Sequence, residues 1–164
     1  MPVQFTDTRS DMATSTRPTA LLVATPGGHL AQLQLIASCF SDFDRRWIST
    51  AHASVDVGDD ALVLAHGPTT RNVGNLLRNM VVAWREIRSS RPDIIVSTGA
   101  GLAVPFFVLG RLLGVHTVFL EVYDRIDSRT LTGRLVRPFC SEFLVQWPEQ
   151  QQVYGGGTVV GALY

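Results

Sequence analysis

Short apolar runs alternate with amphipathic stretches along most of this 164-residue chain. Short apolar runs are typical of buried strands, and apolar positions three or four residues apart are typical of helices. The apolar runs predict strands at residues 20–24, 46–50, 61–65, 93–97, 115–120, 141–146 and 158–160. The amphipathic stretches predict helices at residues 29–40, 70–90, 100–113 and 128–137, with Ser128 capping the last helix.

This alternation of strands and helices predicts an α/β fold: a Rossmann-like parallel sheet with helices on both faces. Right-handed crossovers place ligands at the carboxyl ends of the strands in such a sheet. The chain length suits one domain. Residues 1–17 are polar and lack the apolar core of a signal peptide. We therefore expect a flexible tail over residues 1–17 and a single Rossmann-like domain over residues 18–164.

Two predicted helices could contact a membrane: helix 70–90 through a face rich in arginine, and residues 102–115 through their apolar side chains. Helix 70–90 is the clearer one, and we expect its apolar face to pack on the sheet. That face carries Val73, Leu76, Leu77, Met80, Trp84 and Ile87, whereas Arg71, Arg78 and Arg85 fall on the opposite, solvated face. Residues 102–115 are more apolar but shorter than the roughly 20 residues that span a bilayer. This second segment is either a buried crossover helix or an interfacial one.

Composition excludes several classes of protein. The formal net charge is zero, so the chain lacks the overall excess of positive charge that is typical of nucleic-acid-binding proteins. Every basic residue is Arg, which excludes a P-loop lysine or a Schiff-base lysine. Cys39 and Cys140 form no CxxC pair and suit a reducing cytosol. No two histidines have metal-ligand spacing, so we predict no metal site, and we expect His116 to be structural; the histidines are His29, His52, His66 and His116.

The first junction with candidate chemistry is the segment from Pro26 to His29, after the first predicted strand. Gly27 and Gly28 would let the backbone approach a ligand, and the following helix offers free N–H groups and a positive dipole end. His29 lies at that helix start, where a polar ligand would bind. The alternative is a tight turn in which the histidine caps the helix.

Two further junctions follow later strands. Residues 97–101 resemble the start of a dinucleotide fingerprint, but Val104 holds the third glycine position, so an NAD site is weakly indicated. This loop suits a phosphate or a sugar diphosphate, unless it is only a tight turn. Glu121 follows the strand that ends at Leu120. It could hold sugar hydroxyls, accept a proton, orient His29, or be a solvated carboxylate paired with Arg125.

Four motifs carry a resemblance to a known family. They occur in the same order in PssD-type exopolysaccharide proteins and in the membrane-anchor subunit of the eukaryotic UDP-N-acetylglucosamine transferase that acts on dolichol-linked sugar. The motifs are Leu22-Val-Ala-Thr-Pro-Gly-Gly-His-Leu-Ala-Gln-Leu33, Ser97-Thr-Gly-Ala-Gly-Leu-Ala-Val-Pro105, Phe119-Leu-Glu121 and Phe143-Leu-Val-Gln-Trp-Pro-Glu149. The resemblance covers roughly residues 19–164.

The resemblance implies one half of a GT-B fold, similar to the N-terminal half of MurG-like enzymes. The resemblance also implies a separate, PssE-like subunit that binds the UDP-sugar, and the chain length, which suits one Rossmann-like domain, agrees with this. The implied function is that of the acceptor-binding subunit of an inverting glycosyltransferase in polysaccharide biosynthesis. The transferred group is a hexosyl, N-acetylglucosaminyl or glucuronosyl sugar, and the acceptor is a polyprenyl-diphosphate-linked saccharide.

The same resemblance implies that no cofactor is needed. It also implies a cytoplasmic protein held peripherally on the inner face of the cell membrane, although the N-terminal membrane helix of the eukaryotic relatives is not found in this sequence.

The resemblance also implies roles for individual residues. Gly27, Gly28 and His29 match the loop that faces the lipid-linked acceptor, and Gly99 and Gly101, with Thr98 beside them, match the second glycine-rich loop. His29 is the candidate base, and Glu121 is its competitor. One alternative function is a non-catalytic scaffold that recruits the donor-binding subunit to the membrane. Another is a Rossmann-type oxidoreductase, for which the glycine fingerprint is incomplete.

Overall fold

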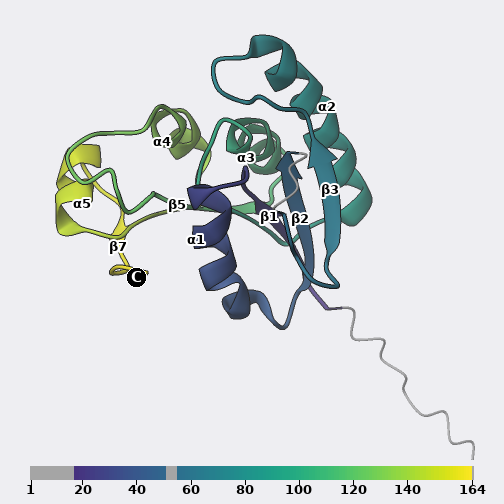
Figure 1. Ribbon diagram of the computed structural model, residues 1–164, viewed down its shortest axis with the longest axis horizontal. Coiled ribbons are helices and arrows are strands. Elements are labelled where there is room, and N and C mark those ends of the chain that lie inside the picture. The colour runs from purple at the N-terminus through teal and green to yellow at the C-terminus, as the bar shows by residue number, and fades with distance from the viewer. Residues whose placement is uncertain (1–16, 51–54, 164) are drawn as a thin grey trace, which may run out of the picture.

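The computed structural model describes residues 17–50 and 55–163, which form a sheet flanked by helices (Figure 1). The strands are β1 (Thr19–Val23), β2 (Asp44–Thr50), β3 (Ala61–Ala65), β4 (Ile94–Ser97), β5 (His116–Leu120), β6 (Glu142–Val145) and β7 (Thr158–Val159). The α-helices are α1 (Gly28–Ile36), α2 (Val73–Ser90), α3 (Ala103–Leu112), α4 (Leu131–Val136) and α5 (Pro148–Tyr154). Except for Arg17, the expected tail lies outside the described residues, as does His52.

The sheet has the strand order β3-β2-β1-β4-β5-β6-β7, and every neighbouring pair is parallel. β1 and β4 are adjacent, with Val23 in register with Ser97. From β1 the chain winds outward through β2 and β3, whereas β4 to β7 extend in the other direction. Such a reversal is a topological switch point, where a crevice opens beyond the carboxyl ends of the strands. The predicted Rossmann-like parallel sheet is confirmed.

β1 lies at the centre of the core because it is apolar on both faces. Leu21 and Val23 belong to the apolar cluster that includes side chains of α2 and α3. Ala20 and Leu22 belong to the cluster that includes side chains of α1. A continuous apolar run is expected for a strand that is covered on both sides. Helices therefore lie on both faces of the sheet, as the sequence predicts.

Several element boundaries differ from prediction because polar side chains set them. α2 begins at Val73, since the side chain of Asn72 accepts a hydrogen bond from the N–H of Asn75. Arg71 therefore precedes the helix, in a left-handed conformation with φ of 49°. α4 begins three residues later than predicted, because Thr130, and not Ser128, caps it. The first predicted helix, 29–40, is divided into α1 and a 3-10 turn at Ala37–Phe40. A second 3-10 turn, Arg137–Phe139, follows α4.

The helix α5 was not predicted. Its sequence, Pro148-Glu-Gln-Gln-Gln-Val-Tyr154, has no apolar repeat that a periodicity argument could detect. Its fold depends on polar contacts. The Gln150 side chain accepts hydrogen bonds from the N–H groups of Gln146 and Trp147 and donates to the carbonyl of Val122.

α2 turns a different face toward the protein from the one predicted, although Arg78 and Arg85 are exposed as expected. Its buried residues are Asn75, Asn79, Ala83 and Ile87. Its exposed apolar residues, which we call the α2 stripe, are Val73 (69% exposed), Leu77 (63%), Val81 (50%) and Trp84 (45%). The prediction that one apolar face packs on the sheet is therefore wrong for Val73, Leu77 and Trp84, whereas Ile87 is buried as expected.

Two asparagines explain this orientation of α2. The side chain of Asn79 accepts a hydrogen bond from the N–H of His66 at 2.8 Å and donates one to the carbonyl of the same residue at 2.9 Å. Asn75 donates to the carbonyl of Pro68 at 3.0 Å. Buried backbone groups must be hydrogen-bonded, and these amides satisfy the loop that follows β3. Facing the stripe inward would leave that loop without its partners.

The sequence left two alternatives for residues 102–115, a buried crossover helix or an interfacial helix. The structure shows the first, because α3 is buried. Leu102, Ala103, Phe106 and Phe107 are all fully buried, and α3 packs against α2, α4 and β5. The ring of Phe107 meets that of Phe119 edge to face at 5.9 Å. In the described part of the chain, no helix has both the length and the apolar character needed to cross a membrane.

Candidate functional site

The three junctions singled out from the sequence meet at the switch point of the sheet. The loop after β1 carries Gly27 to His29, and the loop after the adjacent β4 carries Thr98 to Gly101. Glu121 follows β5, the next strand in the sheet. A single small cavity is lined by residues from all three junctions, among them His29, Gly99 and Glu121. The predicted site residues are thus gathered at the edge where a parallel sheet binds ligands.

His29 is held in one orientation by the second loop. Its Nδ1 lies 2.9 Å from the carbonyl oxygen of Thr98, and the Thr98 hydroxyl donates back to the carbonyl of His29 at 2.6 Å. A carbonyl oxygen can only accept a hydrogen bond, so Nδ1 must carry the proton. In the neutral ring Nε2 then keeps its lone pair and is the atom able to take a proton from a ligand. Thr98, and not Glu121, therefore orients the histidine.

The glycines of the second loop allow close packing inside the site. A Cβ atom added at Gly99 would lie 2.7 Å from two atoms of the His29 ring, and Gly99 has a φ of +129°. A Cβ atom added at Gly101 would lie 2.5 Å from the carbonyl oxygen of Thr69. Both approaches are closer than side-chain carbons tolerate. These glycines bring the histidine ring and the 69–70 segment against the loop.

The glycines of the first loop have open space around them instead. A Cβ atom at Gly27 or Gly28 would meet no other heavy atom of the described residues within 4 Å. No side chain caps the start of α1 at Gly27. The first turn of α1 therefore presents its N–H groups and the positive end of its dipole to a ligand.

Glu121 is a buried carboxylate, with only 1% of its surface exposed, so the alternative of a solvated loop residue is wrong. One carboxylate oxygen accepts from the N–H of Val122 and the other from the hydroxyl of Thr130, both at 2.9 Å. The hydroxyl of Tyr154 also donates to Glu121. Burial, followed by the hydrogen bond to Glu121, raises the pKa of Tyr154 to about 12, so the phenol remains a donor at neutral pH. Glu121 thereby ties the loop after β5 to α4 and α5.

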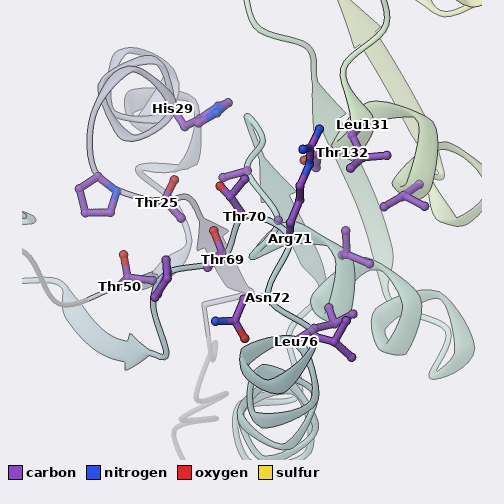
Figure 2. A pocket seen from close by; sticks show the side chains of 17 residues that line it. Thr25, His29, Thr50, Thr69, Thr70, Arg71, Asn72, Leu76, Leu131 and Thr132 are labelled. Atoms are coloured by element: carbon purple, nitrogen blue, oxygen red, sulfur yellow. The ribbon is translucent and has the colours of Figure 1, made fainter.

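A large cavity of about 790 Å³ lies on one side of His29 (Figure 2). Its polar lining includes Arg71 and Thr132, and Figure 2 shows the Arg71 side chain extending toward Thr132. Its apolar lining comes from α2, α3 and α4 and comprises Val73, Leu76, Val104, Leu131 and Leu135. A cation beside an apolar wall suits a ligand with an anionic group joined to a hydrocarbon.

A small cavity of about 310 Å³ lies against the first turn of α1. The two cavities share His29, Ala100 and Thr132, so the histidine lies between them. The small cavity is lined mainly by polar side chains, namely His29, Gln32, Glu121, Tyr123, Asp124, Arg125, Thr130 and Thr132.

Sequence reasoning did not identify Arg71, Thr132 or Gln32 as site residues. Arg71 was placed on α2, and the only local signal against that was Asn72, a good helix cap directly after it. Thr132 lies within a helix and carries no signal in the sequence, whereas Gln32 belongs to the first motif of the resemblance but is not distinguished within it. His116 pairs with Glu142 at 3.0 Å on the surface, in keeping with its expected structural role.

The arrangement can perform base catalysis beside a helix N-terminus. An oriented imidazole can accept a proton, and the α1 N-terminus can stabilise negative charge on a ligand. In residues 17–50 and 55–163, no three His, Cys, Asp or Glu side chains are grouped so that they could hold a metal ion.

Comparisons with known proteins agree on a family. The profile of a family described as "Oligosaccharide biosynthesis protein Alg14 like" matches residues 62–163. The chain is 37% identical over 75 residues to the UDP-N-acetylglucosamine transferase subunit alg14 of Schizosaccharomyces pombe. It is 32% identical over 103 residues to the subunit ALG14 of Eremothecium gossypii. These matches span 43% and 56% of this chain and 36% and 46% of those relatives, so less than half of each relative is covered.

Solved structures show the same fold. MurG of Acinetobacter baumannii superposes with a TM-score of 0.70 and 15% sequence identity, over 88% of this chain and 44% of that protein. The UDP-GlcNAc 2-epimerase of Methanocaldococcus jannaschii superposes with a TM-score of 0.63 and 10% identity, over 82% of this chain and 41% of the epimerase. At these identities the likeness extends to the fold alone. The fold therefore matches one half of a GT-B protein.

Proposed function

The chain belongs to the Alg14-like family of oligosaccharide biosynthesis proteins, and from this premise we propose that it is the acceptor-binding subunit of a two-component inverting glycosyltransferase. In this proposal a PssE-like subunit binds the UDP-sugar, and this chain, over residues 18–164, binds a polyprenyl-diphosphate-linked saccharide. The relatives' names, which describe subunits of a UDP-N-acetylglucosamine transferase, support a sugar transfer divided between chains. The biological context that we propose is polysaccharide assembly of the PssD type.

The observation that carries the proposal is the orientation of His29. Its Nδ1–H donates to the carbonyl of Thr98, and the ring lies between two cavities. An acceptor hydroxyl beside Nε2 would lose its proton to that nitrogen while its oxygen bonds to the anomeric carbon of the donor sugar. The bond from that carbon to the UDP oxygen breaks on the opposite face, and UDP leaves with the electron pair. The anomeric configuration is therefore inverted.

Glu121 acts in this proposal as a positioning residue. Its carboxylate already accepts hydrogen bonds from Val122, Thr130 and Tyr154. Both carboxylate oxygens thus accept hydrogen bonds from the protein itself, whereas Nε2 of His29 keeps its lone pair for a ligand. Glu121 instead holds the loop after β5 against α4, so that the wall of the small cavity stays in place.

The large cavity is the proposed site of the diphosphate and the first part of the lipid. Arg71 supplies a cation there, and the adjacent Thr69 and Thr70 supply hydroxyl groups. Charge-assisted hydrogen bonds from arginine to phosphate are among the stronger polar contacts in proteins. The leucines of α4 and the first turn of α2 continue this cavity as an apolar wall.

Peripheral contact with the inner face of the cell membrane is proposed for the α2 stripe. The stripe is exposed and adjoins the large cavity, since Val73 belongs to both. Arg78, Arg85 and Arg88 are exposed on the same helix, and the Arg88 guanidinium lies 5.1 Å from the centre of the Trp84 ring. An apolar stripe flanked by arginines suits an anionic lipid surface. A lipid tail would then pass from the membrane directly into the site.

The test uses the chain together with the donor-binding subunit that co-purifies with it from native membranes. His29→Ala should reduce transfer by about 100-fold or more, the lower range for the loss of a general base. His116→Ala is the matched control, because this surface histidine pairs with Glu142 and should leave the rate unchanged. A loss of less than about threefold in His29→Ala would make the histidine a turn residue only.

The same preparation distinguishes the competing function of a non-catalytic recruiting scaffold. Both variants should retain the partner during co-purification, because His29 lies at the switch point of the sheet and makes its hydrogen bond within this chain. A scaffold would lose transfer only when it loses its partner. Lost transfer with a retained partner is the result that supports a catalytic histidine.

A further inference from the structure

Gln32 is a buried polar side chain without a partner beside the proposed site. It lies on α1, one turn after His29, and only 1% of its surface is exposed. Its Oε1 has no hydrogen-bond partner among the described residues. Leaving a buried acceptor unpaired costs about 1–3 kcal/mol. Such a cost at the edge of a binding site calls for a functional explanation.

Gln32 lines the small cavity, together with Gly28 and His29 at the start of α1. Gln32, whose Oε1 is unpaired, therefore belongs to the same cavity wall as an uncapped helix start. The other buried polar atoms without partners, Arg46 Nε and Ser49 Oγ, belong to β2 and do not line this cavity. Among the three unpaired buried atoms of the described residues, only Gln32 Oε1 belongs to a residue that lines the small cavity.

The lining of the small cavity favours a ligand that both donates and accepts hydrogen bonds. Gln32 Oε1 and the carboxylate of Asp124 are acceptors, whereas Arg125 and the N–H groups of the α1 start are donors. A phosphate offers only acceptors at its oxygens and would face Oε1 and a carboxylate unfavourably. Sugar hydroxyls donate and accept in turn. Tyr123, which is 45% exposed, adds an aromatic face at the same cavity.

We propose that the small cavity is a monosaccharide subsite, in which a hydroxyl or an amide N–H of the sugar donates a hydrogen bond to Gln32 Oε1. This inference rests on the proposed function and specifies which part of the acceptor binds where. The sugar occupies the small cavity, and its diphosphate and lipid occupy the large cavity on the other side of His29. The acceptor hydroxyl is then presented to Nε2 by the sugar that Gln32 holds.

The experiment measures sugar binding to the full chain without its partner, by two-dimensional NMR of protein labelled with ¹⁵N-glutamine. The probes are free glucose, galactose, N-acetylglucosamine and glucuronic acid, each titrated to millimolar concentration. At least one of these sugars should shift the side-chain signal of Gln32. If none of the four shifts it, the subsite is refuted.

Two variants sharpen this titration. Gln32→Met keeps the shape of the side chain and removes the acceptor, so it should weaken binding of the responding sugar by about 5- to 10-fold, the value of one hydrogen bond. Gln34→Met is the matched control on the same helix, because Gln34 is exposed and donates to the carbonyl of Asp56 instead. Equal sugar affinity in Gln32→Met and the unaltered chain would also refute the subsite.

Thermal unfolding separates this role from a structural one. Gln32→Met removes an unsatisfied buried atom, so its midpoint should equal or exceed that of the unaltered chain. A lower midpoint would show that Gln32 serves the fold instead. The proposed function has its own readout, namely transfer by the reconstituted pair. Transfer that depends on His29 without any sugar shift at Gln32 would overturn the subsite and leave the function standing.

Discussion

α2 and α3 are neighbouring helices on one face of the sheet (Figure 1). They differ in whether their large apolar side chains are buried or exposed. α3 buries its two phenylalanines completely, at Phe106 and Phe107. α2 exposes the four residues of its stripe and buries two asparagines. α3 therefore contributes its large apolar side chains to the core, whereas α2 contributes Ala83 and Ile87 and leaves its stripe on a surface beside the large cavity.

The difference shows that an apolar face of a helix does not by itself identify the face that packs. α3 crosses between β4 and β5 at the centre of the sheet, where it is covered by α2 and α4. α2 must also satisfy the backbone of the loop after β3, and Asn79 does so with two hydrogen bonds to His66. We attribute the orientation to these hydrogen bonds, because the N–H and carbonyl of His66 and the carbonyl of Pro68 would otherwise be left unpaired.

The core role of α3 predicts the largest effect. Phe106→Ala should lower the free energy of unfolding by about 3–5 kcal/mol, because it leaves a cavity in the core. Chemical denaturation monitored by circular dichroism measures this loss. Leu112→Ala on the same helix is the control, since Leu112 is 72% exposed and should change stability little. Similar losses in both variants would remove the distinction between the buried and exposed parts of α3.

The orientation of α2 predicts the next largest effect. Asn79→Leu places an apolar residue on the buried face but leaves the N–H and carbonyl of His66 without their partners. We expect a loss of about 2–3 kcal/mol in the free energy of unfolding. If apolar burial alone oriented the helix, the same change would increase stability, and the denaturation curve would move in the opposite direction.

The α2 stripe predicts a membrane effect without a stability effect. The double change Leu77→Ser and Trp84→Ser should reduce binding to anionic vesicles by about 10-fold or more, because each side chain contributes apolar area at an interface. Flotation with vesicles that contain phosphatidylglycerol measures the bound fraction. Leu35→Ser is the control, since Leu35 is 49% exposed but lies on α1, across the sheet. Unchanged flotation of the double variant would rule out the stripe as the contact.

The arginines beside the stripe predict the smallest effect. Arg78→Gln and Arg85→Gln should each weaken binding to the same vesicles by about fivefold, the value of roughly 1 kcal/mol per charge near an anionic surface. The effect should vanish at high salt, because screening shortens the range of the attraction. A loss that is the same at low and high salt would contradict the electrostatic interpretation.

The fold could be predicted from the sequence because its central strands are locally distinctive. Residues 20–24 are apolar throughout, and the structure buries all of them at the centre of the sheet. The two glycine-rich loops were also identified locally, and parallel strands necessarily bring such loops to one edge. The catalytic roles predicted for His29 and Glu121 stay predictions, and the His29→Ala variant tests the first of them.

The site residues that were missed had little local signal. Gln32 belongs to the first motif of the resemblance, but only the packing of α1 shows that its side chain is buried with Oε1 unpaired. Arg71 was predicted within helix 70–90, and only the cap at Asn72 places it before the helix, in the wall of the large cavity. The buried face of α2 was predicted wrongly for the same reason, since Asn79 and Asn75 bond to loop residues 13 and 7 positions earlier in the chain.

The parallel α/β sheet, its central strand and the loops that form the site follow from apolar periodicity and glycine placement, which are local properties of the chain. The buried face of α2, the protonated nitrogen of His29 and the hydrogen bonds to Glu121 became visible only in the folded protein. These features depend on partners that are distant in sequence, such as Thr98 for His29 and Tyr154 for Glu121. Buried polar groups must find partners wherever the fold supplies them, and that requirement has no local signature.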